Sequence, residues 1–240
     1  MELLIIRHAQ SYNNTLADQS LRVVDPPLTD VGRQQAQLVA EFVAHGQDSD
    51  PHPPGLAGFS ANGRGLAITR LYCSAMLRAL DTACAIAGAT GLKPRVWVDI
   101  HEEGGMWLDH GEGGVLGYPG MTRGEIMEQF PQCVIPETIT DQGWWTAGQE
   151  ELAPFRARAE RVAAELRGMA ATAPDERIAI VTHGGFGAQL IKAIFSVPAD
   201  ANLFFYHNNT GISKVRYRPD GRISMRYQNR LNHLPPELVT

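Results

Sequence analysis

Short apolar runs with no polar side alternate along this chain with stretches that have the spacing of amphipathic helices. The clearest runs are residues 3–6, 68–72 and 178–181. A strand without a polar face must be covered on both sides, which is typical of a parallel sheet between two layers of helices. Helices are expected at residues 28–44, 76–87, 155–170 and 186–195. The alternation predicts a three-layer α/β sandwich on a mostly parallel, doubly wound sheet with helices on both faces.

The remaining segments complete this plan as a single domain over residues 1–240. Residues 211–218 and 222–227 flank the turn Pro219-Asp220-Gly221, which predicts a C-terminal edge hairpin. A flexible insertion rich in proline and glycine is expected around residues 46–65. Around residues 104–146 the rhythm breaks, with many glycines and a short helix expected at 123–130. We interpret this region as a lid-like excursion, in which Trp107, Trp144 and Trp145 serve as core or as a substrate wall.

The net charge and the cysteines of the chain indicate which binding partners and which cellular compartment to expect. The 240 residues include 21 Lys and Arg against 26 Asp and Glu, which gives a formal net charge of −5. We therefore expect no nucleic-acid or membrane partner, and a bound anion must be held by a local group of cations. Cys73, Cys84 and Cys133 lack metal-ligand spacing, so reduced core thiols are expected. The apolar start is too short for a signal sequence or a membrane span, which predicts a cytoplasmic protein.

Two histidines occupy matched places after two of the expected strands. Arg7 and His8 follow the first run directly, and His183 follows the third run, ahead of Gly184 and Gly185. Open α/β sheets bind ligands at the carboxyl ends of their strands. One histidine at such a place could simply stabilise a loop. Two of them, one preceded by an arginine, favour a functional site in a shared crevice.

Four short segments carry a more specific pattern. Their sequences are RHAQSYNN from Arg7, DPPLTDVGRQQA from Asp25, YCSAMLRALDTA from Tyr72 and VTHGG from Val181. In this order they resemble the signature segments of the histidine phosphatase superfamily, the phosphoglycerate mutase-like proteins, with Ala9 where the family has glycine. Ordered matches are far more specific than any single motif. The resemblance implies a phosphatase that forms a phosphohistidine.

The chemistry of phosphate ester cleavage agrees with the resemblance on the roles of the matched residues. Arg7 and Arg78 carry planar donor groups that suit phosphate oxygens. His8 is the expected nucleophile: neutral, with the attacking ring nitrogen free and the other nitrogen donating to a backbone carbonyl. His183 is expected to be a second phosphate ligand that stabilises charge in the transition state. Lesser candidates for phosphate contacts, each of which could equally serve loop hydrogen bonds, are Ser11, Asn14 and the Gly184 amide.

A departing alkoxide also needs a proton donor, which we expect to be a carboxylic acid whose pKa is raised by burial and by the phosphate. The segment IHEEGGMW from Ile100 follows a strand expected at residues 96–98. It resembles the family stretch in which a glutamate precedes a glycine and an aromatic residue. This alignment selects Glu102. Glu103 would then be a solvated neighbour, although the sequence leaves the reverse assignment open.

Other functions remain as alternatives. A metal site suggested by His101, Glu102, Asp109 and His110 is disfavoured, because no close metal-binding motif occurs and the phosphohistidine route needs no metal or other cofactor. The preferred function is a histidine acid-type phosphatase acting on a small phosphorylated metabolite. A cofactor-dependent phosphoglycerate mutase is second, because Arg123 is the only strong cation of residues 104–124. A non-catalytic phosphate binder is third, because all five catalytic positions are filled. A homodimer stays open.

Overall fold

The structure is a computed structural model that describes residues 1–48, 65–198 and 200–240. Its main sheet has six strands in the order β3-β2-β6-β1-β7-β8. Their bounds are β1 Glu2–Arg7, β2 Arg70–Cys73, β3 Arg95–Val96, β6 Arg177–Thr182, β7 Ile212–Tyr217 and β8 Ile223–Arg230. The first four in that order run parallel, while β7 pairs antiparallel with both β1 and β8. The predicted mostly parallel sheet with a C-terminal edge hairpin is therefore confirmed.

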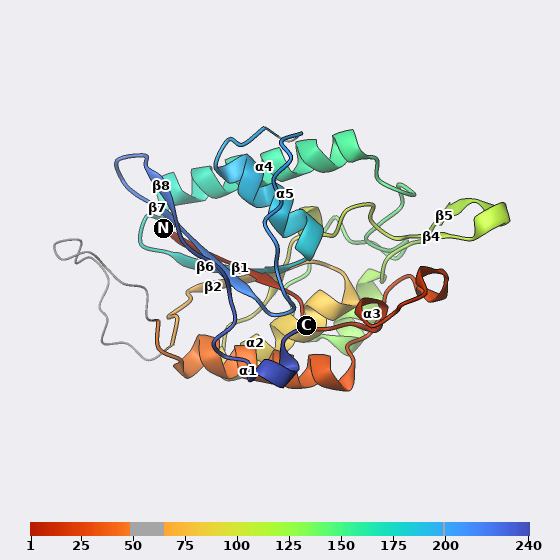
Figure 1. Ribbon diagram of the computed structural model, residues 1–240, viewed down its shortest axis with the longest axis horizontal. Helices are drawn as coiled ribbons and strands as arrows, with labels where there is room; N and C mark the ends of the chain where they lie inside the picture. Colours follow the sequence, from red (N-terminus) through yellow and green to blue (C-terminus); the bar gives the residue numbers. More distant parts are fainter. Residues whose placement is uncertain (49–64, 199) are drawn as a thin grey trace.

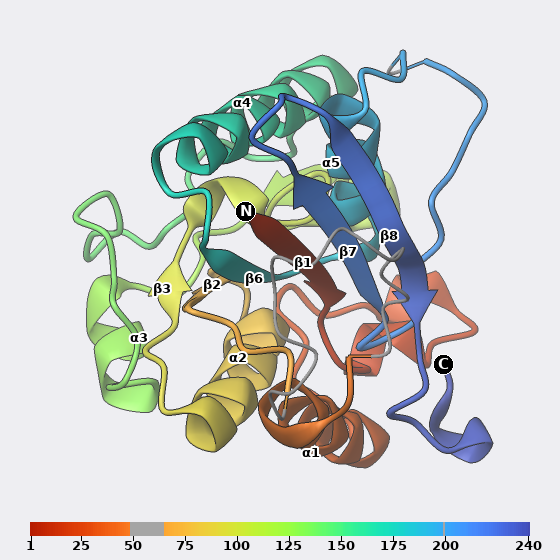
Figure 2. The same ribbon diagram turned by 90° about the vertical axis from the view of Figure 1, so that its left-hand side faces the viewer.

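Two pairs of helices cover the two faces of this sheet. Figures 1 and 2 show α1 (Asp30–His45) and α2 (Leu77–Thr90) on one face, with α4 (Leu152–Thr172) and α5 (Gly184–Ile194) on the other. Alternate residues of β1 supply the two cores: Leu4 and Ile6 pack with α1 and α2, and Leu3 and Ile5 with α4 and α5. Both sides of β1 are buried, which explains its apolar run. Within the described residues, no helix is both long enough and apolar enough to cross a membrane.

Two of the expected strands have different limits. The strand expected at residues 68–72 is Arg70–Cys73, a shift at the boundary. The strand expected at 96–98 is wrong in its second half, since β3 ends at Val96 and a 3₁₀ turn follows at Val98–Ile100. The pairing with β2 involves Arg95 and Val96 and ends where the Trp97 amide donates to the Cys73 carbonyl at 2.8 Å. The turn redirects the chain toward Glu102.

The excursion at residues 104–146 has more regular structure than the sequence indicates. It contains a small antiparallel sheet of β4 (Trp107–Asp109) and β5 (Val115–Gly117), which the sequence analysis missed, followed by α3 (Arg123–Gln129). A capping box between Thr122 and Glu125 begins α3. Trp144 is 6% exposed and belongs to the core on the α1 and α2 face. Of the insertion expected at residues 46–65, residues 49–64 lie outside the described part.

Candidate active site

The ends of β1 and β6 bring the two sequence-predicted histidines together. These strands pair in parallel with Arg7 opposite Thr182, so the next residues, His8 and His183, leave the sheet side by side. Their ring centroids are 5.1 Å apart. Strand register therefore places them at one site without any contribution from the loops.

His8 is only 2% exposed, and its ring is oriented by two hydrogen bonds. Nδ1 lies 2.7 Å from the carbonyl of Ala9, which assigns the proton to Nδ1. The sequence predicts that the other ring nitrogen, Nε2, is free. In the structure it instead accepts a hydrogen bond from Nε of Arg78 at 3.1 Å. The buried guanidinium uses the ring lone pair as its acceptor. Burial, and then the charges of Arg78 and Arg7, lower the pKa of His8 well below its ordinary value, so the ring is neutral.

The loop after β1 is held by side chains from α1, from α2 and from the turn before β7. Thr82 Oγ1 accepts from the Ala9 amide at 3.0 Å, Gln35 Oε1 accepts from the Gln10 amide at 2.8 Å, and Asn209 Nδ2 donates to the His8 carbonyl at 3.0 Å. A Cβ at Gly32 would lie 2.0 Å from the Gln10 carbonyl, so only glycine lets α1 approach the loop. The sequence analysis assigned no role to these residues.

Arg7 and Arg78 both point their charge at this site. Nη1 of Arg7 donates to the His207 carbonyl at 2.7 Å, while its Nε is buried without a hydrogen-bond partner in the described structure. Arg78 is 8% exposed and lies 3.6 Å from Asp25 Oδ1. Burial lowers the pKa of both arginines, yet a guanidinium stays charged in proteins. Asp25 also accepts from the Leu77 amide and so supports Arg78 at the start of α2.

His183 presents one ring nitrogen to the same site. Its Nε2 lies 2.8 Å from Ser74 Oγ, which itself accepts from the Met76 amide at 3.3 Å. We assign the Ser74 proton to this hydrogen bond, which places the ring proton of His183 on Nδ1. Nδ1 is buried and has no hydrogen-bond partner among the described residues. Burial, and then the charge of Arg78, lower the pKa of His183 well below its ordinary value. Ser74 lies within a motif of the sequence, but its role was missed.

Glu102 is the glutamate of the pair that faces the site. Its carboxylate accepts hydrogen bonds from the amides of Phe186 at 2.8 Å and Gly185 at 3.2 Å, in the first turn of α5. Its negative charge also partly offsets the lowering of the pKa of Arg7 and of Arg78 by burial. Glu103 is exposed as a residue. The partial burial of its carboxyl group, and then the negative charges of Glu102 and Glu150, raise its pKa. A Cβ at Gly185 would lie 2.8 Å from Glu102 Oε1, so glycine leaves room for this carboxylate.

The lesser candidates make hydrogen bonds within the loop. Ser11 is buried, and its amide and hydroxyl both donate to Asn14 Oδ1, at 3.0 and 3.1 Å. Asn209 Nδ2 donates to the same oxygen at 3.2 Å. Gly184 is the first residue of α5, where a helix leaves its amides without intrahelical acceptors, and it adjoins the Arg7 side chain.

The residues weighed for a metal site are dispersed. His110 Nε2 lies 2.7 Å from the hydroxyl of Tyr118, whereas His101 packs against Trp144 and Trp145. In the described ranges, no three His, Cys, Asp or Glu side chains form a group that could hold a metal ion. The cysteines are free thiols, with the Sγ atoms of Cys84 and Cys133 3.8 Å apart.

A hollow of about 430 Å³ lies between two segments that lead from the site. Its lining is Gln19, Ser20, Arg22, Trp107, Leu108, Asp109, His110 and Gly111. Figure 1 shows the loop after β1 and the β4–β5 hairpin at the same end of the molecule. One wall, residues 19–22, lies just before Asp25, which pairs with Arg78. The other wall begins at Trp107, and the indole of Trp107 contacts Gly104, two residues after Glu102. Arg22 lies outside the sequence motifs, so the sequence alone assigns it no role.

Comparison with known proteins gives the family. The model of the histidine phosphatase superfamily (branch 1) matches residues 3–51 and 57–230. The chain belongs to the histidine phosphatase superfamily. The expected membership is thus confirmed.

Relatives in the histidine phosphatase superfamily are phosphatases of small metabolites. Glucosyl-3-phosphoglycerate phosphatase of Mycobacterium tuberculosis is 28% identical over 202 residues, which are 82% of this chain and 76% of that protein. The structure of a putative alpha-ribazole-5'-P phosphatase from Escherichia coli matches with a TM-score of 0.62 and 19% identity, over 96% of this chain and 97% of that one. Phosphoserine phosphatase from Entamoeba histolytica matches with a TM-score of 0.60 and 19% identity, over 98% and 99%. These two likenesses confirm the fold.

Proposed function

We propose that this protein is a phosphomonoesterase of the histidine acid type that hydrolyses a small phosphorylated metabolite through a phosphohistidine on His8. The observation that carries the proposal is a pair of buried, unpaired donors, Arg7 Nε and His183 Nδ1, beside a neutral nucleophile. A buried donor without a partner costs about 1–3 kcal/mol. A phosphate group would satisfy both donors, and Arg78 would supply further hydrogen bonds and charge.

In the first step, Nε2 of His8 attacks phosphorus and the ester P–O bond breaks. Arg78 transfers its Nε hydrogen bond from the ring to a phosphate oxygen, which frees the lone pair. The proton stays on Nδ1 of His8 and is donated to the Ala9 carbonyl, so positive charge that develops on the ring is stabilised. Arg7, Arg78 and His183 stabilise the charge on the equatorial oxygens. The departing alkoxide takes the proton of the Glu102 carboxyl group.

In the second step, the Glu102 carboxylate takes a proton from water, and the water oxygen attacks phosphorus. The N–P bond breaks, inorganic phosphate leaves, and neutral His8 is restored. Glu102 therefore serves as acid and then as base, and no metal or other cofactor enters either step.

We further propose that the leaving group occupies the hollow between Arg22 and Trp107 and that it carries a carboxylate. Arg22 supplies a cation at one wall, while Trp107 and Asp109 suit the apolar faces and hydroxyl groups of a polyol or sugar. The 28% identical relative is named for a substrate of this kind, a glucosylated phosphoglycerate. A phosphorylated hydroxy acid, free or glycosylated, is the substrate class that fits both observations.

The free thiols of Cys73, Cys84 and Cys133 support a reducing, cytoplasmic setting. The net charge of −5 supports a small phosphorylated substrate, held by local cations, and not a nucleic acid or an anionic membrane. Whether the enzyme acts as a homodimer is tested by measuring its mass in solution.

The test of the proposal is turnover of phosphoglycerates and sugar phosphates, followed by release of inorganic phosphate with and without EDTA. We expect phosphate release that needs no bisphosphoglycerate primer and is unchanged by EDTA. Rapid quenching should trap an acid-labile, base-stable phosphoenzyme that is absent from His8→Ala. Interconversion of 2- and 3-phosphoglycerate faster than phosphate release would instead establish a mutase, and label on another residue would refute His8 as the nucleophile.

A further inference from the structure

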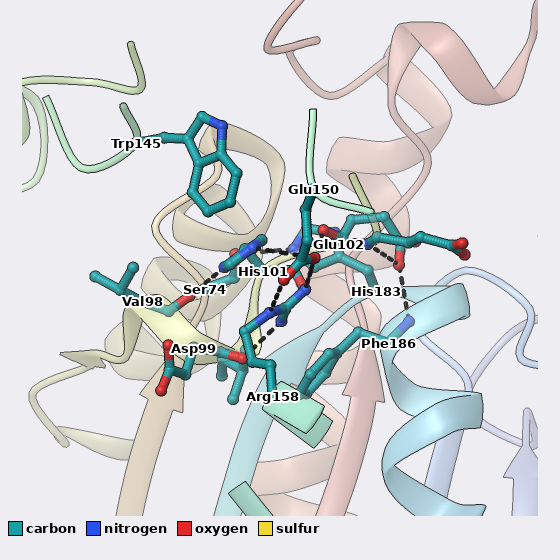
Figure 3. Close-up of polar contacts among 12 residues, drawn as sticks. Ser74, Val98, Asp99, His101, Glu102, Trp145, Glu150, Arg158, His183 and Phe186 are labelled. Atoms are coloured by element: carbon teal, nitrogen blue, oxygen red, sulfur yellow. Dashed lines mark hydrogen bonds and ion pairs between the residues drawn. The ribbon is translucent and has the colours of Figure 1, made fainter. Parts of the chain in front are cut away.

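Arg158 of α4 lies beside the segment that carries Glu102 and is 2% exposed. Its Nε and Nη2 donate to the two carboxylate oxygens of Glu150, at 2.8 and 2.6 Å (Figure 3). Its Nη1 donates to the carbonyls of Asp99 and His101, at 2.7 and 2.9 Å. Nη2 also lies 3.5 Å from the Glu102 carbonyl. One planar side chain therefore contacts three carbonyls in the four residues that end at Glu102.

Glu150 keeps this buried guanidinium paired. Burial opposes ionisation of the carboxyl group, but the hydrogen bonds from Arg158 and the nearby ring of His101 prevail and lower the pKa of Glu150 to about 2. The rings of Phe155 and Phe186 lie 5.4 and 4.8 Å from the guanidinium carbon and pack against it. Arg158 and Glu150 are thus both charged at neutral pH. Their two parallel hydrogen bonds confine them to one geometry, as is typical of a bidentate arginine–carboxylate pair.

His101 fixes the same segment from its other side. Its Nδ1 donates to the Val98 carbonyl at 2.7 Å, and its Nε2 lies 3.7 Å from Glu150 Oε2. Its ring packs against Trp145 at 4.7 Å between centroids. The backbone that precedes Glu102 is therefore clamped, while the Glu102 carboxylate itself is held by the amides at the start of α5.

We propose that Arg158 and Glu150 are positioning residues for proton transfer by Glu102. The inference rests on the proposed function, in which Glu102 is the acid. The pair fixes the carbonyls of residues 99–102 and thereby sets the distance between the Glu102 carboxyl group and the departing alkoxide. Misplacement of a catalytic group by 1 Å costs about 10²-fold in rate. Loss of the pair should therefore impair proton delivery while the proposed phosphate ligands Arg7, Arg78 and His183 stay in place.

Arg158→Lys tests this directly, because lysine keeps the charge beside Glu150 but cannot bind two carboxylate oxygens and three carbonyls together. The substrates are an alkyl phosphate that the enzyme hydrolyses and 4-nitrophenyl phosphate, whose leaving group needs little protonation. We expect kcat for the alkyl ester to fall about 10- to 100-fold and kcat for the nitrophenyl ester to fall less than about threefold. Glu150→Gln, which keeps the side-chain shape, should show the same selectivity with a smaller loss. If Arg158→Lys does not fold, the Glu150→Gln variant tests the positioning role in its place.

Arg167→Lys is the matched control. Arg167 lies on the same helix and also donates to two carbonyls, those of Ala193 and Ile194 at 2.9 Å each, but at the opposite end of α5 from Gly185. Its replacement removes similar backbone contacts without touching residues 99–102. The ratio of the two ester rates should stay at the wild-type value, and thermal unfolding of all variants identifies any general loss of structure.

The same substitutions in a Glu102→Gln background separate the two proposals. If Arg158 acts through Glu102, Arg158→Lys should add less than about threefold once the acid is gone. An equal loss for both esters, or a full additional loss in the Glu102→Gln background, overturns the positioning role alone. If Glu102→Gln itself lowers both ester rates equally, Glu102 is not the acid, and the catalytic assignment fails together with the inference.

Discussion

The two halves of the site are built in different ways. In the half proposed to bind phosphate, Arg7, His8 and His183 lie at or just past the ends of adjacent parallel strands, and backbone register brings these three together. The proton-donor half lies on a segment that leaves the sheet after the two residues of β3. It is held by side chains such as Arg158, which lies 59 residues away in sequence from its contact Asp99.

This difference separates binding of phosphate from delivery of the proton. Backbone register changes little when one side chain is replaced, so variants of the phosphate half should lose phosphate ligands and slow all esters alike. A segment held by side chains can shift by fractions of an ångström. Its variants should slow esters according to how strongly the leaving group needs a proton.

His8→Ala should give the largest effect. Without the nucleophile, we expect turnover of alkyl and nitrophenyl esters to fall by at least about 10⁴-fold, with no trapped phosphoenzyme. His8 is buried and hydrogen-bonded, so thermal unfolding should show a loss of about 1–3 kcal/mol in stability. The control is His45→Ala, an exposed residue at the end of α1. Retention of more than a few per cent of activity by His8→Ala would contradict the assignment.

Glu102→Gln should come next and should distinguish between the esters. We expect kcat for alkyl esters to fall about 10²- to 10⁴-fold, the range of a lost general acid, and kcat for 4-nitrophenyl phosphate to fall less than about tenfold. Glu103→Gln is the matched control, since Glu103 is exposed, and should change either rate by less than about threefold. The opposite ranking of the two glutamates would move the acid to Glu103.

Arg22→Gln should affect binding and not chemistry. Removing a charge-assisted hydrogen bond of about 1.5 kcal/mol should raise KM about tenfold for a phosphorylated hydroxy acid. KM for glycerol phosphate, which has no carboxylate, should change little, and kcat should stay the same for both. Arg222→Gln, in the exposed turn between β7 and β8, is the control. A similar rise in KM for both substrates would show that Arg22 does not recognise a carboxylate.

The smallest expected effect is on how the free energy of unfolding depends on pH through His233. Burial lowers the pKa of His233 from 6.5 to about 4, so below pH 6.5 the unfolded chain binds a proton that the folded protein does not. The stabilisation is therefore complete above pH 7 and is lost as the pH falls from 6.5 toward 4. Urea unfolding should show His233→Gln losing about 1–2 kcal/mol less than wild type between pH 7 and pH 5. An identical loss in both proteins would contradict this.

Much of the fold follows from short-range patterns. The apolar runs predict β1, β2 and β6, and the turn at Pro219-Asp220-Gly221 predicts the hairpin of β7 and β8. The end of β3 and the β4–β5 hairpin were not predicted. Apolarity could not give the length of β3, because its pairing with β2 and with Val134 sets that length, and the short strands of the excursion carry little alternation.

The sequence by itself determined the family and the order of the residues proposed to bind phosphate, because each motif lies within one strand, one loop and one helix start, where near neighbours fix the geometry. Only the tertiary structure placed the Glu102 carboxylate against the start of α5, brought Ser74 to His183, and set Arg22 opposite Trp107. Each of these depends on contacts between segments far apart in the chain, such as the 109 residues between Ser74 and His183. Spacing within a motif carries no information about such contacts, since packing of the whole core decides which distant segments meet.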